Sequence, residues 1–187
     1  MASFDEHFER ARKALEDRER VAARAACEAA LAVATEPYQK ALALDGLADT
    51  YFFEDDKDRA LDLLDQAIAL CLPEDSPTDM GTSYALTQSW YDKATFLSMM
   101  HRDEEALSVL EELLHRHLDR VTDTPQSRWE LEFCVLVARA LRMKSTLLLT
   151  KQQNAESIVC CEEVIRHFGG AKDDRLLRHV ARAVYWR

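Results

Sequence analysis

Proline and glycine, the residues that most often interrupt helices, are rare and widely spaced in this chain. Each occurs only four times in 187 residues, and tight turns between β-strands usually need more of them. Pro37, Pro77 and Pro125 each come one or two residues after a Ser or Thr. Proline is favoured at the first position of a helix, and Ser or Thr just before it can cap the helix. The gaps of 40 and 48 residues between these prolines predict stacked helical hairpins.

The stretches between these interruptions are rich in Ala, Leu, Glu and Arg, which favour helices. Ser3 with Glu6 predicts a capping box at the first helix, and the acidic residues around Asp56 favour a helix start there. Gly169 predicts a helix end. We therefore expect an all-α fold of about nine helices, at residues 3–16, 18–34, 37–53, 56–71, 77–100, 103–119, 125–149, 152–168 and 173–186.

A chain of this length forms one compact domain or one short repeat array. We expect a single helical repeat domain over residues 1–187. Its predicted parts are four hairpins and a terminal helix, at residues 1–35, 37–72, 77–119, 125–168 and 173–186.

Two segments carry a spaced pattern of large and small residues. Residues 44–67 match it well, through Leu44, Leu47, Ala48, Tyr51, Ala60 and Ala67. Residues 90–113 match it in part, through Trp90, Ala94, Leu97, Ala106 and Leu113. This pattern resembles the tetratricopeptide repeat (TPR) family. Lys93 stands where the family has Leu, Leu113 stands where it has a second small residue, and the rest of the chain matches poorly.

The resemblance implies a right-handed α-solenoid of antiparallel helical hairpins. Its small residues, such as Ala48 and Ala60, would let helices approach to within about 8–10 Å. Its large residues, such as Tyr51 and Trp90, would fill the space between neighbouring hairpins.

In the TPR family the first helix of each hairpin lines a concave groove. The resemblance implies that the groove residues of this chain are Asp45, Asp49, Phe52, Gln88, Tyr91, Thr95 and Met99. An acidic pair beside aromatic and Met side chains predicts a partner protein or peptide with basic and apolar residues. The alternative is that Asp45 and Asp49 lie on a solvated surface, and that Phe52, Phe53 and Met99 belong to the core. At least one of the two adjacent phenylalanines must do so, because they point in different directions.

Charge is unevenly distributed. The net charge of −10 disfavours nucleic acid as a partner, because binding it requires many phosphate contacts from Lys and Arg. Residues 41–119 hold 18 acidic and 5 basic side chains, whereas residues 120–187 hold 8 acidic and 12 basic ones. This asymmetry could steer a basic partner to the middle of the chain, favour head-to-tail self-contact, or reflect only an uneven solvated surface.

We expect no contact with a membrane, because no apolar run approaches the roughly 20 residues of a spanning helix. The first residues, Met1–Glu6, lack the features of a signal peptide, so we expect a cytoplasmic protein. Five cysteines without C-x-x-C spacing predict buried free thiols. For the adjacent Cys160 and Cys161 we expect one core residue and one boundary residue.

The chain carries no signature of an enzyme. Its four glycines cannot form a G-x-G-x-x-G or P-loop turn, and neither H-E-x-x-H nor G-x-S-x-G occurs. His115 and His117 are two residues apart and so point to different sides of a helix. We therefore expect no catalytic residues, no cofactor and no metal site.

The predicted last helix, 173–186, carries an apolar stripe of Leu176, Val180 and Val184. We expect this stripe to be uncovered by the rest of the predicted array. It could cap the array, form a homodimer, or mark a chain that continues into further repeats.

These features favour an interaction scaffold or adaptor that binds a partner segment in the concave groove. The alternatives are a cytoplasmic chaperone for a secreted protein and a self-assembling structural unit. A small-molecule sensor or a helical enzyme is the least favoured class, because it needs an apolar pocket with convergent polar groups.

Overall fold

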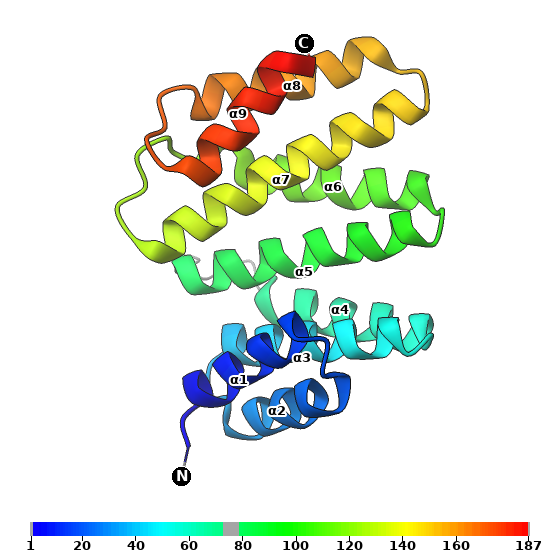
Figure 1. The fold of residues 1–187 in the computed structure, drawn as a ribbon, viewed down its shortest axis with the longest axis vertical. Coiled ribbons are helices and arrows are strands. Elements are labelled where there is room, and N and C mark those ends of the chain that lie inside the picture. The colour runs from blue at the N-terminus through cyan, green and yellow to red at the C-terminus, as the bar shows by residue number, and fades with distance from the viewer. Residues whose placement is uncertain (1, 73–78, 187) are drawn as a thin grey trace. The chain divides into compact units, whose positions relative to one another are not determined.

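The computed structural model describes residues 2–72 and 79–186, and the regular elements of these residues are all helices (Figure 1). This confirms the all-α prediction. The elements are α1 (Phe4–Glu16), α2 (Arg20–Val33), α3 (Pro37–Phe53), α4 (Lys57–Cys71), α5 (Met80–Met99), α6 (Asp103–His117), a short 3₁₀ helix η1 (Leu118–Arg120), α7 (Arg128–Thr150), α8 (Asn154–Phe168) and α9 (Asp174–Trp186).

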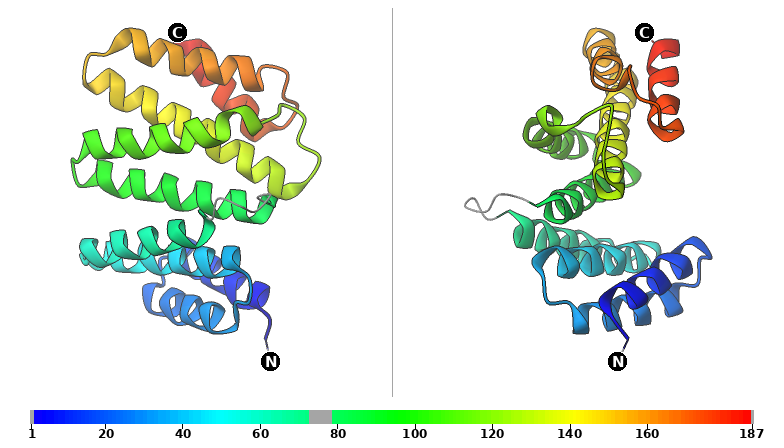
Figure 2. Two further views of the ribbon diagram at one scale, coloured as in Figure 1. Left: turned by 180° about the vertical axis from the view of Figure 1, so that it is seen from behind. Right: turned by 90° about the vertical axis from the view of Figure 1, so that its left-hand side faces the viewer.

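The chain divides into two compact units, Met1–Phe96 and Leu97–Arg187. In the first unit α1 packs on α2, α2 on α3 and α3 on α4, and α1 also reaches α3. In the second unit α6 packs on α7 and α7 on α8, while α9 lies against both α7 and α8 (Figure 2). A single repeat domain over residues 1–187 stays a prediction.

Four hairpin turns in the described residues share one backbone geometry. They join α1 to α2, α3 to α4, α5 to α6, and α7 to α8. Each has one residue with a left-handed φ of 59–71°, namely Arg18, Asp55, His101 and Gln152. In each, the next residue donates its amide hydrogen to the carbonyl five residues earlier, at 2.8–3.0 Å, which satisfies an otherwise free carbonyl at the helix end. The four turns therefore have the same backbone geometry, although no glycine marks them.

The predicted helix starts are partly confirmed. Ser3 and Glu6 form the expected capping box, with hydrogen bonds of 2.8 and 3.3 Å. Pro37 is the first residue of α3, and the Gln39 side chain accepts a hydrogen bond from the Glu36 amide just before it.

The predicted start at Pro125 is wrong. Ser127 caps α7 instead, since its hydroxyl accepts a hydrogen bond from the Glu130 amide at 3.1 Å. The Glu130 carboxylate reaches back to the Gln126 amide at 2.7 Å. Together these bonds fix the helix start at Arg128, three residues later than the proline predicted. Pro77 lies outside the described residues, and α5 is capped by Asp79, which accepts from the Thr82 amide at 2.9 Å.

The small residues of the repeat pattern are buried. The pattern's alanines are all fully buried, namely Ala48, Ala60, Ala67, Ala94 and Ala106. Trp90 is also buried, whereas Tyr51 is half-buried and lies 4.2 Å from the Arg24 guanidinium. Lys93, which departs from the family pattern, forms an ion pair with Asp65 of α4.

All five cysteines are buried free thiols, as predicted. The expectation that Cys160 and Cys161 differ in burial is wrong, because each is only 5% exposed. Adjacent helical residues point in directions about 100° apart. Both sides of α8 are covered, since α7 and α9 pack against it.

The prediction that the stripe on the last helix is uncovered is wrong for Leu176, which is fully buried. Helix α9 folds back on α7 and α8 of its own chain and buries Leu176 and Ala183. Val180 is half-buried and Val184 is 60% exposed. A homodimer through residues 173–186 stays a prediction.

We expect Ala60→Arg to unfold the first unit. Ala60 has no exposed surface, so a guanidinium there would be buried without a partner, which costs more than about 4 kcal/mol. Circular dichroism during heating measures the change in Tm. Ala69→Arg, on the exposed face of the same helix α4, is the control and should change Tm little. A folded Ala60→Arg protein with an unchanged Tm would contradict this packing.

We expect Gly46→Ala to destabilise the protein, although alanine favours helix. A Cβ at Gly46 of α3 would lie 2.7 Å from the Cys27 Sγ atom of α2. Overpacking of this kind costs about 1–3 kcal/mol, against a gain of about 1 kcal/mol in helix propensity. Cys27→Ala removes the clash, so a double-mutant cycle measured by denaturant unfolding should give a favourable coupling. Strictly additive effects would show that these two helices do not meet at this point.

Candidate functional site

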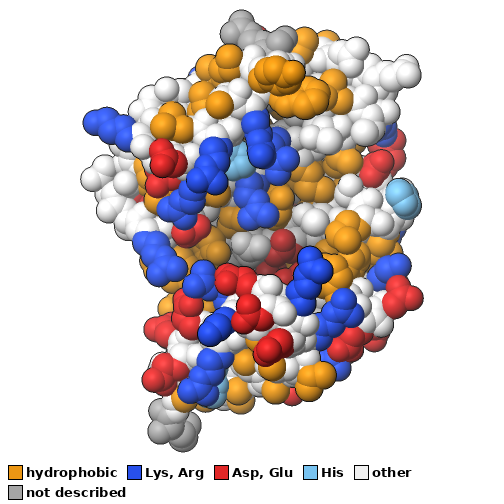
Figure 3. Space-filling view, in the orientation of Figure 1, with side chains coloured by type: hydrophobic (Ala, Val, Ile, Leu, Met, Phe, Trp, Pro, Cys, Tyr) orange, Lys and Arg blue, Asp and Glu red, His pale blue; other side chains and the backbone are white. Residues whose placement is uncertain are grey.

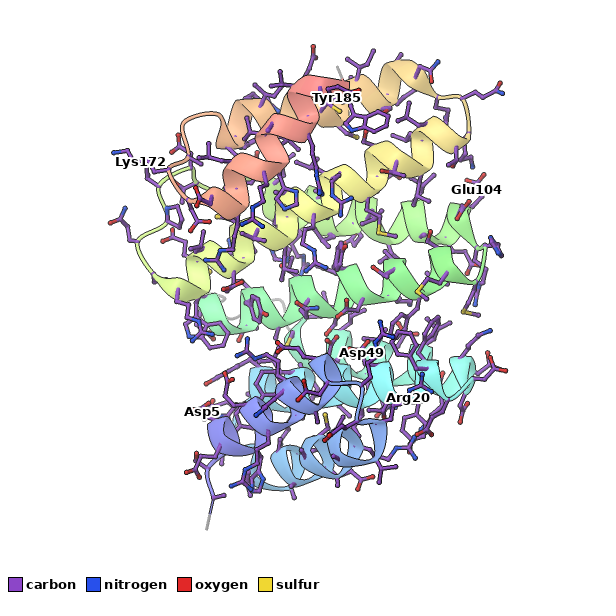
Figure 4. All side chains as sticks on the ribbon, in the orientation of Figure 1. Asp5, Arg20, Asp49, Glu104, Lys172 and Tyr185 are labelled. Carbon is purple, nitrogen blue, oxygen red and sulfur yellow. The ribbon has the colours of Figure 1, made fainter. Side chains whose placement is uncertain are left out.

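Three aspartates from two helices converge in the first unit. Asp45 and Asp49 are four residues apart on α3, which places them on one face of the helix. Asp92 comes from α5, and its charge acts on both α3 carboxyl groups. All three line a small cavity of about 160 Å³. We call these residues the aspartate cluster; Asp49 is labelled in Figure 4.

Asp45 is the most deeply placed of the three. Asp45 is only 7% exposed, and its Oδ1 atom has no hydrogen-bond partner among the described residues. Burial raises the pKa of Asp45 well above its ordinary value, and the neighbouring carboxyls of Asp92 and Asp49 raise it further. The cluster therefore holds negative charge reluctantly.

Asp49 is half-buried beside them. Burial, and then repulsion from Asp92, raises its pKa to about 7. Each effect disfavours the charged carboxylate. A cation brought next to Asp49 and Asp92 would stabilise the charged form and oppose both effects.

The rest of this cavity is mixed in character. The Gln88 side-chain amide donates to the Asp92 carboxylate, and Arg12 of α1 lies at the wall, in an ion pair with Glu9 at 2.7 Å. The apolar part of the lining comes from α1, α2 and α3 and comprises Phe8, Ala11, Leu15, Cys27 and Leu42.

A second cavity of about 350 Å³ adjoins the first, since Leu15 and Asp49 line both. It lies between the α1–α2 turn and the end of α3. Arg20, labelled in Figure 4, donates to the Phe53 carbonyl at 2.6 Å, and the Phe53 ring is 50% exposed. We call the two cavities together the α1–α3 groove.

The structure brings together three of the seven residues predicted to bind a partner. Asp45, Asp49 and Gln88 line the same cavity. Phe52 and Tyr91 are buried, at 6% and 7% exposure. Phe52 stacks on Phe96, with ring centroids 4.0 Å apart, and so belongs to the core as the alternative interpretation held.

Thr95 and Met99 do not join this site. The Thr95 hydroxyl donates to the Tyr91 carbonyl of its own helix at 2.9 Å. Met99 is 53% exposed and belongs to the second unit, so it is exposed as predicted but outside the α1–α3 groove.

Sequence reasoning missed Asp92, Arg12 and Phe8. Asp92 lies four residues after Gln88, so helical spacing alone places the two on one face. Arg12 and Phe8 lie on α1, whose residues match the repeat pattern poorly, and only the packing of α1 on α3 brings them to the cavity.

Two further observations apply to residues 2–72 and 79–186. No group of three or more His, Cys, Asp or Glu side chains there is arranged to hold a metal ion. None of the helices there combines the length and apolar character that crossing a membrane requires.

Comparison with protein-family models, with curated proteins and with solved structures finds no match for this chain.

We expect Asp49→Asn to stabilise the protein at high pH and to change it little near pH 4. With a raised pKa, native Asp49 keeps a proton that the unfolded chain loses, so native stability falls as the pH rises from about 4 to 7. Asparagine removes this loss, so the free energy of unfolding should rise by at most about 4 kcal/mol. Urea unfolding between pH 4 and 8 measures this free energy.

Asp62→Asn, which makes the same charge change on the exposed face of α4, is the matched control. The difference between the two variants should grow as the pH rises and then level off above pH 7. A constant difference across this range would mean that Asp49 titrates as an ordinary surface carboxylate.

Proposed function

We propose that this chain is a protein-interaction domain whose α1–α3 groove binds a partner segment that carries a Lys or Arg next to apolar residues. The observation that carries this proposal is the buried, unpaired Oδ1 atom of Asp45 beneath two further carboxyl groups. Buried charges are normally paired. A cationic side chain placed over the cluster would relieve the repulsion and pair the charge.

The two cavities have sizes that suit neighbouring residues of one segment. The smaller, of about 160 Å³, has room for a single side chain at the aspartate cluster. The larger, of about 350 Å³, offers the exposed Phe53 ring and the Leu15 side chain as apolar contacts. Because Leu15 and Asp49 line both cavities, one extended segment can occupy both.

The arginines around the groove narrow the choice of partner. Arg12 lies at the smaller cavity, and Arg18 and Arg20 lie at the larger one. They would repel a run of basic residues. The favoured partner therefore presents one basic side chain with apolar or acidic neighbours, and such opposed charges give specificity and register more than affinity.

We further propose that the four hairpins form a TPR-like right-handed solenoid and that the protein acts as a scaffold or adaptor. The shared geometry of the turns at Arg18, Asp55, His101 and Gln152 supports this. So do the fully buried alanines of the repeat pattern.

Selection from a displayed library of random short peptides on the full chain tests the proposed function. We expect the bound peptides to share one Lys or Arg beside an apolar residue. Fluorescence anisotropy then measures the affinity of a selected peptide. Asp49→Asn should weaken binding by at least about tenfold, the effect of losing about 1.4 kcal/mol at a partly buried charge pair. The affinity should also fall as salt is added.

Asp62→Asn, with the same charge change outside the groove, should bind the selected peptide unchanged. Bound peptides without a basic residue, or equal affinity in the Asp49 and Asp62 variants, would contradict the proposal. Binding of arginine amide as tight as that of the peptide would assign the cluster to a small amine instead.

A further inference from the structure

A cavity of about 410 Å³ lies in the second unit, between α7, α8 and α9. It is the largest of the three cavities described here, and its walls are mainly apolar. The apolar side chains include Leu141 and Leu149 of α7, Val164 of α8, and Ala183 and Trp186 of α9. This volume is at the lower end of the roughly 300–1,000 Å³ of small-molecule sites.

Basic groups converge on this apolar cavity from two helices. Arg142 of α7 and His179 and Arg182 of α9 line it, and none of its described lining residues is acidic. The Arg142 Nε atom and the His179 Nδ1 atom are both buried and have no hydrogen-bond partner among the described residues. Figure 3 shows Lys and Arg side chains gathered around a histidine in the region of α7 and α9. Such unpaired buried donors are rare in native proteins.

The surroundings of His179 indicate a positive potential in the cavity. Burial, and then the nearby charges of Arg142, Arg182 and Arg139, together lower the pKa of His179 to about 4. His179 is therefore neutral near pH 7 and can offer a hydrogen bond without adding charge. An anion is the ligand that this potential attracts.

The hydroxyl groups of the lining already form hydrogen bonds. The hydroxyl groups of Ser145 and Ser157 form a hydrogen bond of 2.8 Å, and the Cys161 Sγ atom lies 3.6 Å from the Ser145 hydroxyl. The Thr146 hydroxyl donates to the Arg142 carbonyl at 3.0 Å. Among the lining residues, buried nitrogen atoms without a partner thus occur at Arg142 and His179, and the apolar part of the wall suits an apolar chain.

We propose that this cavity binds a small amphipathic carboxylate, a medium-chain aliphatic acid, with the carboxylate between Arg142 and Arg182 and the chain against α8 and Trp186. The paired fork of a guanidinium matches a carboxylate, and His179 can donate one more hydrogen bond to it. Every residue that carries this inference lies in the second unit. The inference therefore does not depend on the α1–α3 groove of the first unit.

Isothermal titration of the full chain with decanoate tests the inference. We expect saturable binding with one ligand per chain, and affinities that rise from hexanoate to decanoate by up to about fourfold per methylene. Decanol and decyltrimethylammonium share the chain but lack the negative charge, so they should bind at least about tenfold more weakly. Because Trp186 lines the cavity, decanoate should also change tryptophan fluorescence, and Trp186→Phe should abolish that change.

Arg142→Met and Arg182→Met keep side-chain length and remove the charge. Each should weaken decanoate binding by at least about tenfold. Arg178→Met is the matched control, since Arg178 is exposed on α9 outside the cavity lining, and it should bind decanoate as the parent does. Thermal unfolding of the free variants checks that all three are folded.

Several outcomes would overturn the inference. One is the absence of saturable decanoate binding by the folded parent protein. Another is equal affinity for decanoate, decanol and decyltrimethylammonium, which would indicate adsorption on an apolar surface. A third is equal weakening by Arg178→Met, which would indicate a general effect of net charge.

Discussion

Close approach of helices at small residues is the constraint on which the rest of this structure depends. Ala48 and Ala60 are fully buried where α3 and α4 pack, and Gly46 leaves room for the Cys27 sulfur of α2. A larger side chain at these positions would push the helices apart, and interiors packed at native density have no space to absorb it. Because α3 packs closely against its neighbouring helices, carboxyl groups at other positions of α3 lie in the protein interior. The aspartate cluster therefore follows from the packing.

The aspartate cluster of the first unit and the cavity between α7, α8 and α9 of the second each contain buried polar atoms without a hydrogen-bond partner, and these atoms have opposite character. The first unit holds carboxyl groups, with Asp45 at the bottom. The second holds basic groups, with Arg142 and His179 inside an apolar cavity. Unpaired buried polar atoms cost stability, and native proteins tolerate that cost mainly where function requires it. This common feature is why we propose a cationic partner for the first unit and an anionic ligand for the second.

Much of the fold could be predicted from sequence, and the failures have identifiable causes. The helices were predicted to within a few residues because apolar spacing and interrupting residues are local properties. The predicted start of α7 is misplaced because the helix is capped by the Ser127 hydroxyl and begins after it, not at Pro125. In the site, Asp45, Asp49 and Gln88 were predicted, but Asp92 was missed because it is not one of the repeat positions that line a groove. The cavity between α7, α8 and α9 was not predicted at all, since it exists only where α9 packs back on α7 and α8.

The sequence by itself determined the all-helical class, the positions of most helices to within a few residues, the burial of the small residues and the free thiols. These features depend on interactions within one or two turns of helix, or on side-chain size and hydrophobicity. Side-chain size and hydrophobicity are properties of each residue type. Only the tertiary structure decided which polar groups lie together and which are buried. Phe52 and Phe53 are adjacent and chemically identical, yet one is in the core and the other is half exposed. The reason is physical: burial, and the pKa shifts that it causes, depend on which helices cover a residue, and those helices come from distant parts of the chain.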